Sequence, residues 1–185
     1  MIISEKKNFE RKIFKKLMEK SSSIERKNVE INVKLFIETF IKKGMKINYI
    51  GIYWPLKNEV DLRSLHDKYS LALPRCTKNR ELLFCVWDDK NLTKDSEGIL
   101  SPDLSRKLTY KNISMIFIPC LAVDKNLTRL GYGGGYFDRL RRDKNWRTIP
   151  CVGILTSHCV SNTLLTRADW DIPLSGFITE KEILV

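Results

Sequence analysis

The chain has 185 residues, the length of one ordinary domain, and 43% of them are apolar. That share can build a core without disulfides or a structural metal, which excludes a largely disordered protein. Lys and Arg number 33 against 22 Asp and Glu, and +7 of the resulting +11 charge falls in the first 46 residues. This excess favours anionic partners, such as nucleotides, polyglutamate tails, nucleic acids or acidic lipids.

The cysteines and the apolar runs indicate a protein of the cytoplasm. The five cysteines are an odd number without a C-x-x-C pair, so we expect reduced core thiols rather than a disulfide framework or a zinc site. The longest apolar run, residues 115–123, is much shorter than the roughly 18 residues that span a membrane. The first twenty residues lack the apolar stretch of a secretory signal. We therefore expect a cytoplasmic localisation and no membrane partner.

The spacing of apolar residues predicts two helices in the segment 4–44. Ser4 is the expected cap of the first helix, and Ser22 begins the second with the capping box S-x-x-E. Gly44 ends the second helix. The apolar residues at helical spacing are Phe9, Ile13, Phe14 and Leu17 in the first helix, and Val29, Val33, Phe36, Ile37 and Phe40 in the second.

Six apolar runs are typical of β-strands, and several are apolar on both faces, as in central strands covered by helices. They occupy residues 47–54, 70–74, 82–87, 113–120, 148–155 and 176–180. Helices are expected between them at residues 61–69, 135–142 and 161–167. This alternation predicts one α/β domain over residues 1–185, with a mixed, mostly parallel central sheet and helices on both faces. The helical segment 4–44 is expected to pack on the sheet.

Four of the nine glycines fall within residues 131–135, in the block R-L-G-Y-G-G-G-Y-F-D-R between a strand and a helix. Glycines at such a junction let backbone N–H groups converge on a phosphate. Arg129 and Arg139 flank the loop, and Asp138 could hold Mg²⁺ beside phosphates. The block is neither a Walker A nor a G-x-G-x-x-G motif. Taken alone, it could also serve only a sharp turn, with Asp138 stabilised by the helix dipole.

The glycine block closely resembles the signature of the 5-formyltetrahydrofolate cyclo-ligase family, also called the methenyltetrahydrofolate synthetases. Further blocks resemble segments of that family in the same order over nearly the whole chain. They are K-N-F-E-R at residues 7–11, IGIYWPLKNEVD at 50–61, FIPCLAVD at 117–124 and WDIPLSGFITE at 170–180.

The resemblance implies an enzyme that uses ATP and Mg²⁺ to cyclise 5-formyltetrahydrofolate to 5,10-methenyltetrahydrofolate, with release of ADP and phosphate. The formyl oxygen would attack the γ-phosphate, and N10 would then close the ring of the resulting N5-iminium phosphate. The implied partners are the two small-molecule substrates, with no nucleic acid. We expect a monomer.

The resemblance also implies roles for individual residues. The catalytic residues are Lys7, Arg129 and Asp138. The ATP-binding residues are Lys7, Arg11, Arg129, Leu130, Gly131, Tyr132, Gly133, Gly134, Gly135, Tyr136 and Phe137. The folate-binding residues are Trp54, Glu59 and Tyr136, and the Mg²⁺ ligands are Asp138 and Asp171. Several of these residues also have an interpretation that does not depend on the family resemblance. Lys7 and Arg11 could form a solvated basic helix face, and Trp54 could be a core residue at a sheet edge. Glu59 and Asp171 could be ordinary turn carboxylates.

Several positions depart from the family pattern, so the resemblance does not fix the roles of residues in the carboxyl-terminal half of the site. They are Ser101, Cys120, Val160, Thr166, Ala168 and Trp170, the last of which stands where the family usually has His. Two other readings therefore remain: a divergent relative that binds nucleotide or folate without turnover, and a basic nucleic-acid-binding protein. The histidines, His66 and His158, match no family position.

Overall fold

The computed structural model describes residues 2–88 and 92–185, which form a central sheet of seven strands in the order β11-β10-β9-β6-β1-β2-β3. The neighbours from β10 to β2 run parallel, whereas the edge strands β3 and β11 are antiparallel. The mixed, mostly parallel sheet is therefore confirmed. Its strands are β1 (Tyr49–Gly51), β2 (Leu71–Cys76), β3 (Leu82–Trp87), β6 (Ile113–Pro119), β9 (Cys151–Ile154), β10 (Gly176–Ile178) and β11 (Ile183–Leu184).

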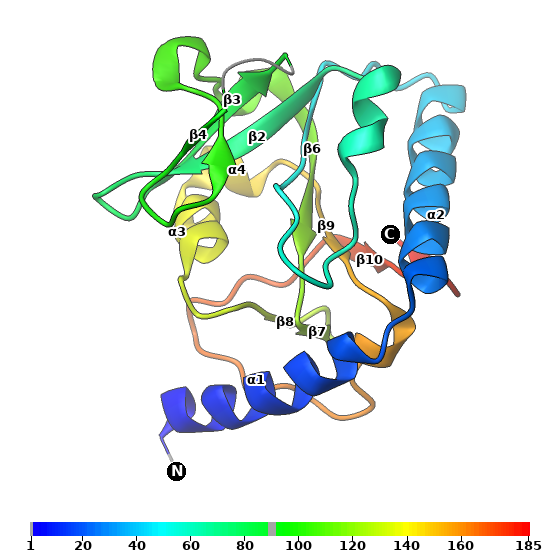
Figure 1. Cartoon of the computed structure of the whole chain (residues 1–185), viewed down its shortest axis with the longest axis vertical. Coiled ribbons are helices and arrows are strands. Elements are labelled where there is room, and N and C mark those ends of the chain that lie inside the picture. The colour runs from blue at the N-terminus through cyan, green and yellow to red at the C-terminus, as the bar shows by residue number, and fades with distance from the viewer. Residues whose placement is uncertain (1, 89–91) are drawn as a thin grey trace.

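Helices cover both faces of the sheet (Figure 1). The α-helices are α1 (Ile3–Glu19), α2 (Ser23–Lys42), α3 (Tyr136–Arg142) and α4 (Lys144–Arg147). One core cluster joins α2 to the sheet, and the other joins it to α1, α3 and α4. Each parallel strand is thus buried on both sides, which explains its nearly continuous apolar sequence.

The cap of α2 is confirmed, whereas the expected cap of α1 is wrong. Ser22 Oγ accepts a hydrogen bond from the Glu25 N–H (3.1 Å), and the Glu25 carboxylate accepts one from the Ser22 N–H (2.7 Å). Gly44 follows the end of α2 with φ +81°. Helix α1 begins before Ser4, at Ile3, because the Glu5 carboxylate satisfies the Ile2 N–H at 3.1 Å.

The helix expected at residues 161–167 is wrong, because distant side chains satisfy the backbone of this segment. Asp124 Oδ2 accepts from the Leu165 N–H and Glu10 Oε1 from the Thr166 N–H, both at 2.9 Å. The helix expected at residues 61–69 is a shorter 3₁₀ turn, η1 (Arg63–Asp67). The further 3₁₀ turns are η2 (Leu104–Arg106), η3 (Tyr110–Asn112) and η4 (Ser157–Cys159).

Two small hairpins that the sequence did not predict surround the glycine block. They pair β4 (Thr93–Lys94) with β5 (Leu100–Ser101), and β7 (Ala122–Val123) with β8 (Arg129–Leu130). Chain order therefore leads from β6 through the β7–β8 hairpin into the glycine loop and then into α3. The loop lies at the carboxyl end of a central strand, where open α/β sheets bind their ligands.

All five cysteines are buried and free, as expected for core thiols. Among the described residues, no helix is long and apolar enough to cross a bilayer.

Candidate active site

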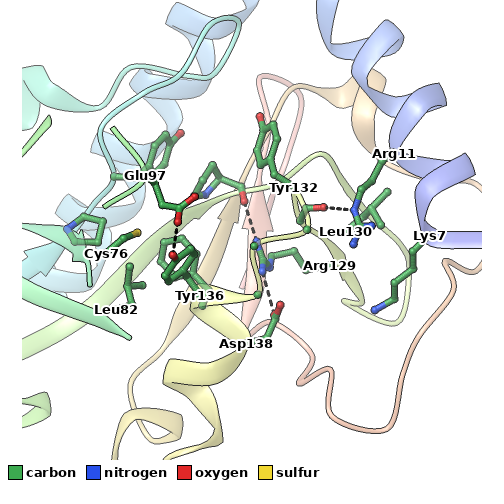
Figure 2. Close-up of a pocket in the computed structure, with 18 of the residues that line it drawn as sticks. Lys7, Arg11, Cys76, Leu82, Glu97, Arg129, Leu130, Tyr132, Tyr136 and Asp138 are labelled. Atoms are coloured by element: carbon green, nitrogen blue, oxygen red, sulfur yellow. Dashed lines mark hydrogen bonds and ion pairs between the residues drawn. The ribbon is translucent and has the colours of Figure 1, made fainter. Parts of the chain in front are cut away.

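A cavity of about 940 Å³ is bounded by α1, the loop after β1, the β4–β5 hairpin and the glycine loop (Figure 2). It is lined by every residue to which the sequence assigned a site role, from Lys7 on α1 to Asp171 near the carboxyl terminus. The assigned residues come from four separate segments of the chain and meet at one place. Their individual roles stay predictions.

The glycine loop approaches the cavity with an exposed backbone. Gly133 and Gly135 have φ of +109° and +67°, a conformation that favours glycine. Gly134 lacks such a φ, but a Cβ there would lie 3.0 Å from the Tyr136 ring. At Gly131, a Cβ would lie 2.8 Å from the Arg129 guanidinium. The backbone conformation at Gly133 and Gly135 thus favours glycine, and the close contacts at Gly131 and Gly134 disfavour a larger side chain.

Arg129 and Asp138 form a largely buried ion pair behind the loop. Arg129 Nη2 lies 3.0 Å from Asp138 Oδ1, and the Arg129 side chain is only 9% exposed. Burial alone raises the pKa of Asp138, but the charge and hydrogen bond of Arg129 outweigh it, so that the pKa is lowered. Asp138 is therefore ionised at neutral pH.

One face of α1 turns its polar side chains toward the cavity, as Figure 2 shows for Lys7 and Arg11. Lys7 Nζ pairs with the Asp171 carboxylate, and Arg11 Nε donates to the Gly131 carbonyl at 2.9 Å. The opposite face carries Phe9 and Ile13, which are exposed although they are apolar. The helix thus presents two cations to the glycine loop.

Asp138 and Asp171 line the same cavity, and each is paired with a cation. Among the described residues, no group of three or more His, Cys, Asp or Glu side chains could hold a metal by itself. Mg²⁺ usually takes one or two carboxylates together with phosphate oxygens and waters. The two carboxylates therefore fit Mg²⁺ only when a phosphate-bearing ligand completes the set.

Glu59 lines the cavity, and one of its carboxylate oxygens lacks a hydrogen-bond partner among the described residues. Glu59 is 8% exposed, and its Oε2 accepts a hydrogen bond from the Leu56 N–H at 2.7 Å. Oε1 is buried and has no hydrogen-bond partner among the described residues. Burial raises the pKa of Glu59 more than the Leu56 amide and the neighbouring Tyr132 hydroxyl lower it. A buried orphan acceptor in a cavity wall marks a place for ligand N–H donors.

Two aromatic side chains assigned to the folate line the cavity, and each has neighbours that fix its ring. Trp54 packs edge-to-face against Trp87 with ring centroids 6.2 Å apart. The Tyr136 hydroxyl donates to the Glu97 carboxylate at 2.5 Å (Figure 2). Glu97 belongs to the β4–β5 hairpin, which sequence reasoning missed because only the tertiary fold brings it to the glycine loop.

The positions that depart from the family pattern have different surroundings. Trp170 lines the cavity and is 56% exposed. Ala168 donates its N–H to Asp171 Oδ2 at 2.7 Å, so it helps to orient that carboxylate. Ser101 is buried outside the cavity lining, and its hydroxyl accepts from Arg75 at 3.0 Å. Of these three residues, only Trp170 lies where it can touch a ligand, whereas Ala168 can act only through Asp171.

Asp124, the acidic residue before the glycine loop, has a structural role. Its Oδ1 accepts from the N–H groups of Asn126 and Thr128, and its Oδ2 accepts from the Leu165 N–H, each at 2.9 Å. The side chain is 1% exposed. It therefore joins the β7–β8 turn to the segment that leads to Asp171.

Comparisons with known proteins agree with this architecture. A sequence model of the 5-formyltetrahydrofolate cyclo-ligase family matches residues 4–180. The 5-formyltetrahydrofolate cyclo-ligase of Haemophilus influenzae is 27% identical over 136 residues, which cover 68% of this chain and 72% of that protein. The Mycoplasma pneumoniae cyclo-ligase is 24% identical over 166 residues, 86% of this chain and 90% of that protein.

Two solved structures are similar over nearly the full length. The 5,10-methenyltetrahydrofolate synthetase of Aquifex aeolicus has a TM-score of 0.78 and 29% identity, covering 100% of this chain and 92% of that chain. The synthetase of Mycoplasma pneumoniae has a TM-score of 0.69 and 25% identity, covering 94% of this chain and 98% of that chain. The family match over residues 4–180, together with these relatives, shows that the chain belongs to the 5-formyltetrahydrofolate cyclo-ligase family.

Proposed function

We propose that the chain catalyses the ATP- and Mg²⁺-dependent cyclisation of 5-formyltetrahydrofolate to 5,10-methenyltetrahydrofolate. The observation that carries this proposal is a single cavity with two kinds of site. A glycine loop surrounded by cations suits a triphosphate, and the orphan carboxylate oxygen of Glu59 suits a ring with N–H donors.

The triphosphate is proposed to bind at the glycine loop. Lys7, Arg11 and Arg129 all line the cavity there, and clustered cations are the usual means of holding phosphate oxygens. They would also neutralise charge that develops as the γ-phosphoryl group is transferred. Arg11 bonds to the loop at Gly131, which holds its guanidinium beside the proposed phosphate site.

The folate is proposed to bind with its pterin at Glu59. A pterin carries an amino group beside a ring N–H, and a carboxylate can accept hydrogen bonds from both. Oε2 is already bonded to the Leu56 amide, whereas Oε1 lacks a partner among the described residues. Trp54 and Tyr136 supply aromatic surface in the same cavity for the flat parts of the substrate.

The proposed reaction has two steps. The formyl oxygen attacks the γ-phosphorus, the bond to the bridging oxygen of ADP breaks, and an N5-iminium phosphate forms. N10 then attacks the formyl carbon and loses its proton, while phosphate leaves with the formyl oxygen. The protein mainly has to hold the two substrates in line and stabilise the charge on the transferring group.

Asp138 and Asp171 are proposed to hold Mg²⁺ beside the phosphates. When bound, the ion would supply positive charge to the phosphoryl oxygens. In the structure, Arg129 pairs with Asp138 and Lys7 pairs with Asp171. On substrate binding, Lys7 and Arg129 would turn toward the phosphates, and both carboxylates would then be fully available to the metal.

The direct test is the appearance of methenyltetrahydrofolate absorbance when the protein is mixed with 5-formyltetrahydrofolate, ATP and Mg²⁺. Product should form only when all three are present. Calorimetric binding of both substrates without product would instead identify a divergent relative that has lost turnover. A salt-dependent gel shift with nucleic acid, without stabilisation by ATP, would support the basic nucleic-acid-binding alternative.

We expect Gly134→Val to abolish detectable ATP binding while the protein stays folded. A branched side chain would crowd the Tyr136 ring and block the approach of phosphate to the exposed backbone. Titration calorimetry with MgATP measures the loss, and circular dichroism checks the fold. Gly134→Ala is the graded control and should weaken ATP binding less. Wild-type ATP affinity in a folded Gly134→Val variant would contradict the phosphate-loop assignment.

We expect Asp171→Asn to bind ATP more tightly than wild type when EDTA removes divalent ions, by roughly two- to fivefold. The substitution removes the charge that holds Lys7 and so frees this cation for phosphate. Added Mg²⁺ should then strengthen ATP binding less than in wild type. The measurement is a pair of titrations with and without Mg²⁺. Weaker ATP binding in EDTA would show that Lys7 does not exchange partners.

A further inference from the structure

Each aromatic ring assigned to the folate has an arginine over one of its faces. The Arg63 guanidinium carbon lies 4.6 Å from the centre of the Trp54 ring. The Arg139 guanidinium carbon lies 4.8 Å from the centre of the Tyr136 ring. Such distances are within the range of cation–π attraction.

Both arginines lie outside the cavity, although both aromatic rings line it. Among the described residues that form the lining, Trp54 and Tyr136 are present, and Arg63 and Arg139 are not. Each guanidinium group therefore contacts its ring from a position outside the described cavity lining. They leave the cavity side of each ring as the surface that a flat ligand can contact.

Other contacts fix each arginine in this position. Arg63 donates to both carboxylate oxygens of Asp61, at 2.9 Å from Nε and 2.6 Å from Nη2. Arg139 donates to the carbonyls of Gly134 and Arg80, both at 2.8 Å. A planar guanidinium held by two bonds can keep a ring parallel to itself, which a flexible ammonium group does less well.

We propose that Arg63 and Arg139 are positioning residues that hold Trp54 and Tyr136 as one-sided stacking surfaces for the flat rings of the folate. The proposal rests on the proposed function, because it assigns these rings to the folate substrate. Neither arginine touches the substrate; each acts through an aromatic side chain. Binding to a ring that is already fixed costs less conformational entropy than binding to a mobile ring. Loss of either arginine should therefore weaken folate affinity and leave the rate of the chemical step unchanged.

Arg63 provides the cleaner test, because Arg139 also bonds to the glycine loop. Arg63 and Asp61 have side chains that are 39% and 48% exposed, and such a pair contributes little to global stability. Arg63→Met should therefore fold and melt like wild type. Its dissociation constant and KM for 5-formyltetrahydrofolate should rise roughly three- to tenfold, while kcat and MgATP affinity stay unchanged. Arg63→Lys should recover part of the loss.

The chain offers a matched control close by. Lys68 pairs with Glu38 at 2.9 Å and lies 5.7 Å from the centre of the Tyr69 ring, so it makes the same two kinds of contact. Tyr69 does not belong to the described lining of the cavity. Lys68→Met should leave folate affinity unchanged.

A double variant decides whether Arg63 acts through Trp54. Trp54→Leu should weaken folate binding by itself, and adding Arg63→Met should then cause no further loss. An unchanged KM in Arg63→Met would overturn the inference, as would an equal effect of that substitution with or without Trp54. If wild type binds no 5-formyltetrahydrofolate, the proposed function fails and the inference with it. If wild type binds 5-formyltetrahydrofolate and Arg63→Met leaves the folate affinity unchanged, the inference alone fails.

Discussion

Replacing Asp138 by asparagine is expected to lower kcat by roughly 100-fold or more, while folate affinity stays close to wild type. The carboxylate lines the cavity beside the glycine loop, and the charge of Arg129 keeps it ionised. Asparagine keeps the size of the side chain but removes the charge that would bind Mg²⁺ at the transferring phosphoryl group. Steady-state kinetics at several Mg²⁺ concentrations and calorimetry with 5-formyltetrahydrofolate measure the two effects.

The substitution also leaves the buried Arg129 charge without its partner, so a control must separate stability from catalysis. Removing one member of a buried ion pair can cost about 3–5 kcal/mol, and we therefore expect a lower melting temperature. Kinetics should be measured well below that temperature. Asp143→Asn is the matched control, because Asp143 is exposed and caps α4. Asparagine caps a helix equally well, so this variant should keep full turnover.

The outcome distinguishes a metal ligand from a structural carboxylate. If Asp138→Asn keeps the normal rise of rate with Mg²⁺ concentration, the assignment of Asp138 to the metal is wrong. Equal losses of turnover and folate affinity would point to a general disturbance of the cavity. A loss of turnover with intact folate binding fits only a role at the phosphates.

The sequence predicted those features that depend on neighbouring residues. The Ser22 capping box and the glycine loop are local patterns, and both form as expected. The parallel strands were recognisable because burial on both faces leaves a continuous apolar run. The family and the enzyme class, which the glycine block indicated, are confirmed by the comparisons.

Features that depend on distant partners could not be predicted. Segment 161–167 is irregular because Asp124 and Glu10 satisfy its backbone, and no local pattern contains that information. The Lys7–Asp171 pair joins residues 164 positions apart in the chain. The family blocks indicated that both residues belong to the site, but not that they form an ion pair with each other. Long-range ion pairs of this kind become visible only in the folded chain.

Replacing Glu59 by glutamine is expected to weaken folate binding by about 5- to 150-fold and to leave ATP binding unchanged. The estimate corresponds to roughly 1–3 kcal/mol for leaving a buried donor unpaired. Glutamine keeps the size of the side chain but turns one acceptor oxygen into a donor, which would face the N–H groups of the pterin. The proposed ATP site consists of the glycine loop and the cations of α1, which do not bond to Glu59 in the described structure.

Two calorimetric titrations measure this prediction, one with 5-formyltetrahydrofolate and one with MgATP. Glu81→Gln is the matched control, because Glu81 is exposed beside β3 and lies outside the described lining of the cavity. It should leave both affinities unchanged. Unaltered folate binding in Glu59→Gln would reduce Glu59 to a buried structural acid. Wild-type protein that binds ATP but no folate would contradict the cyclo-ligase proposal as a whole.

The pH dependence of folate affinity tests the same carboxylate without relying on a variant alone. Burial raises the pKa of Glu59, so its proton returns at a higher pH than that of an exposed glutamate. Only the ionised carboxylate can accept from two N–H donors at once. Wild-type folate affinity should therefore fall as the pH decreases through this raised pKa. At pH values above this pKa, folate affinity should stay constant. Glu59→Gln has no proton to gain, so its weaker affinity should not share this acid limb. If the limb persists in the variant, another group is responsible for it, and Glu59 does not bind the pterin.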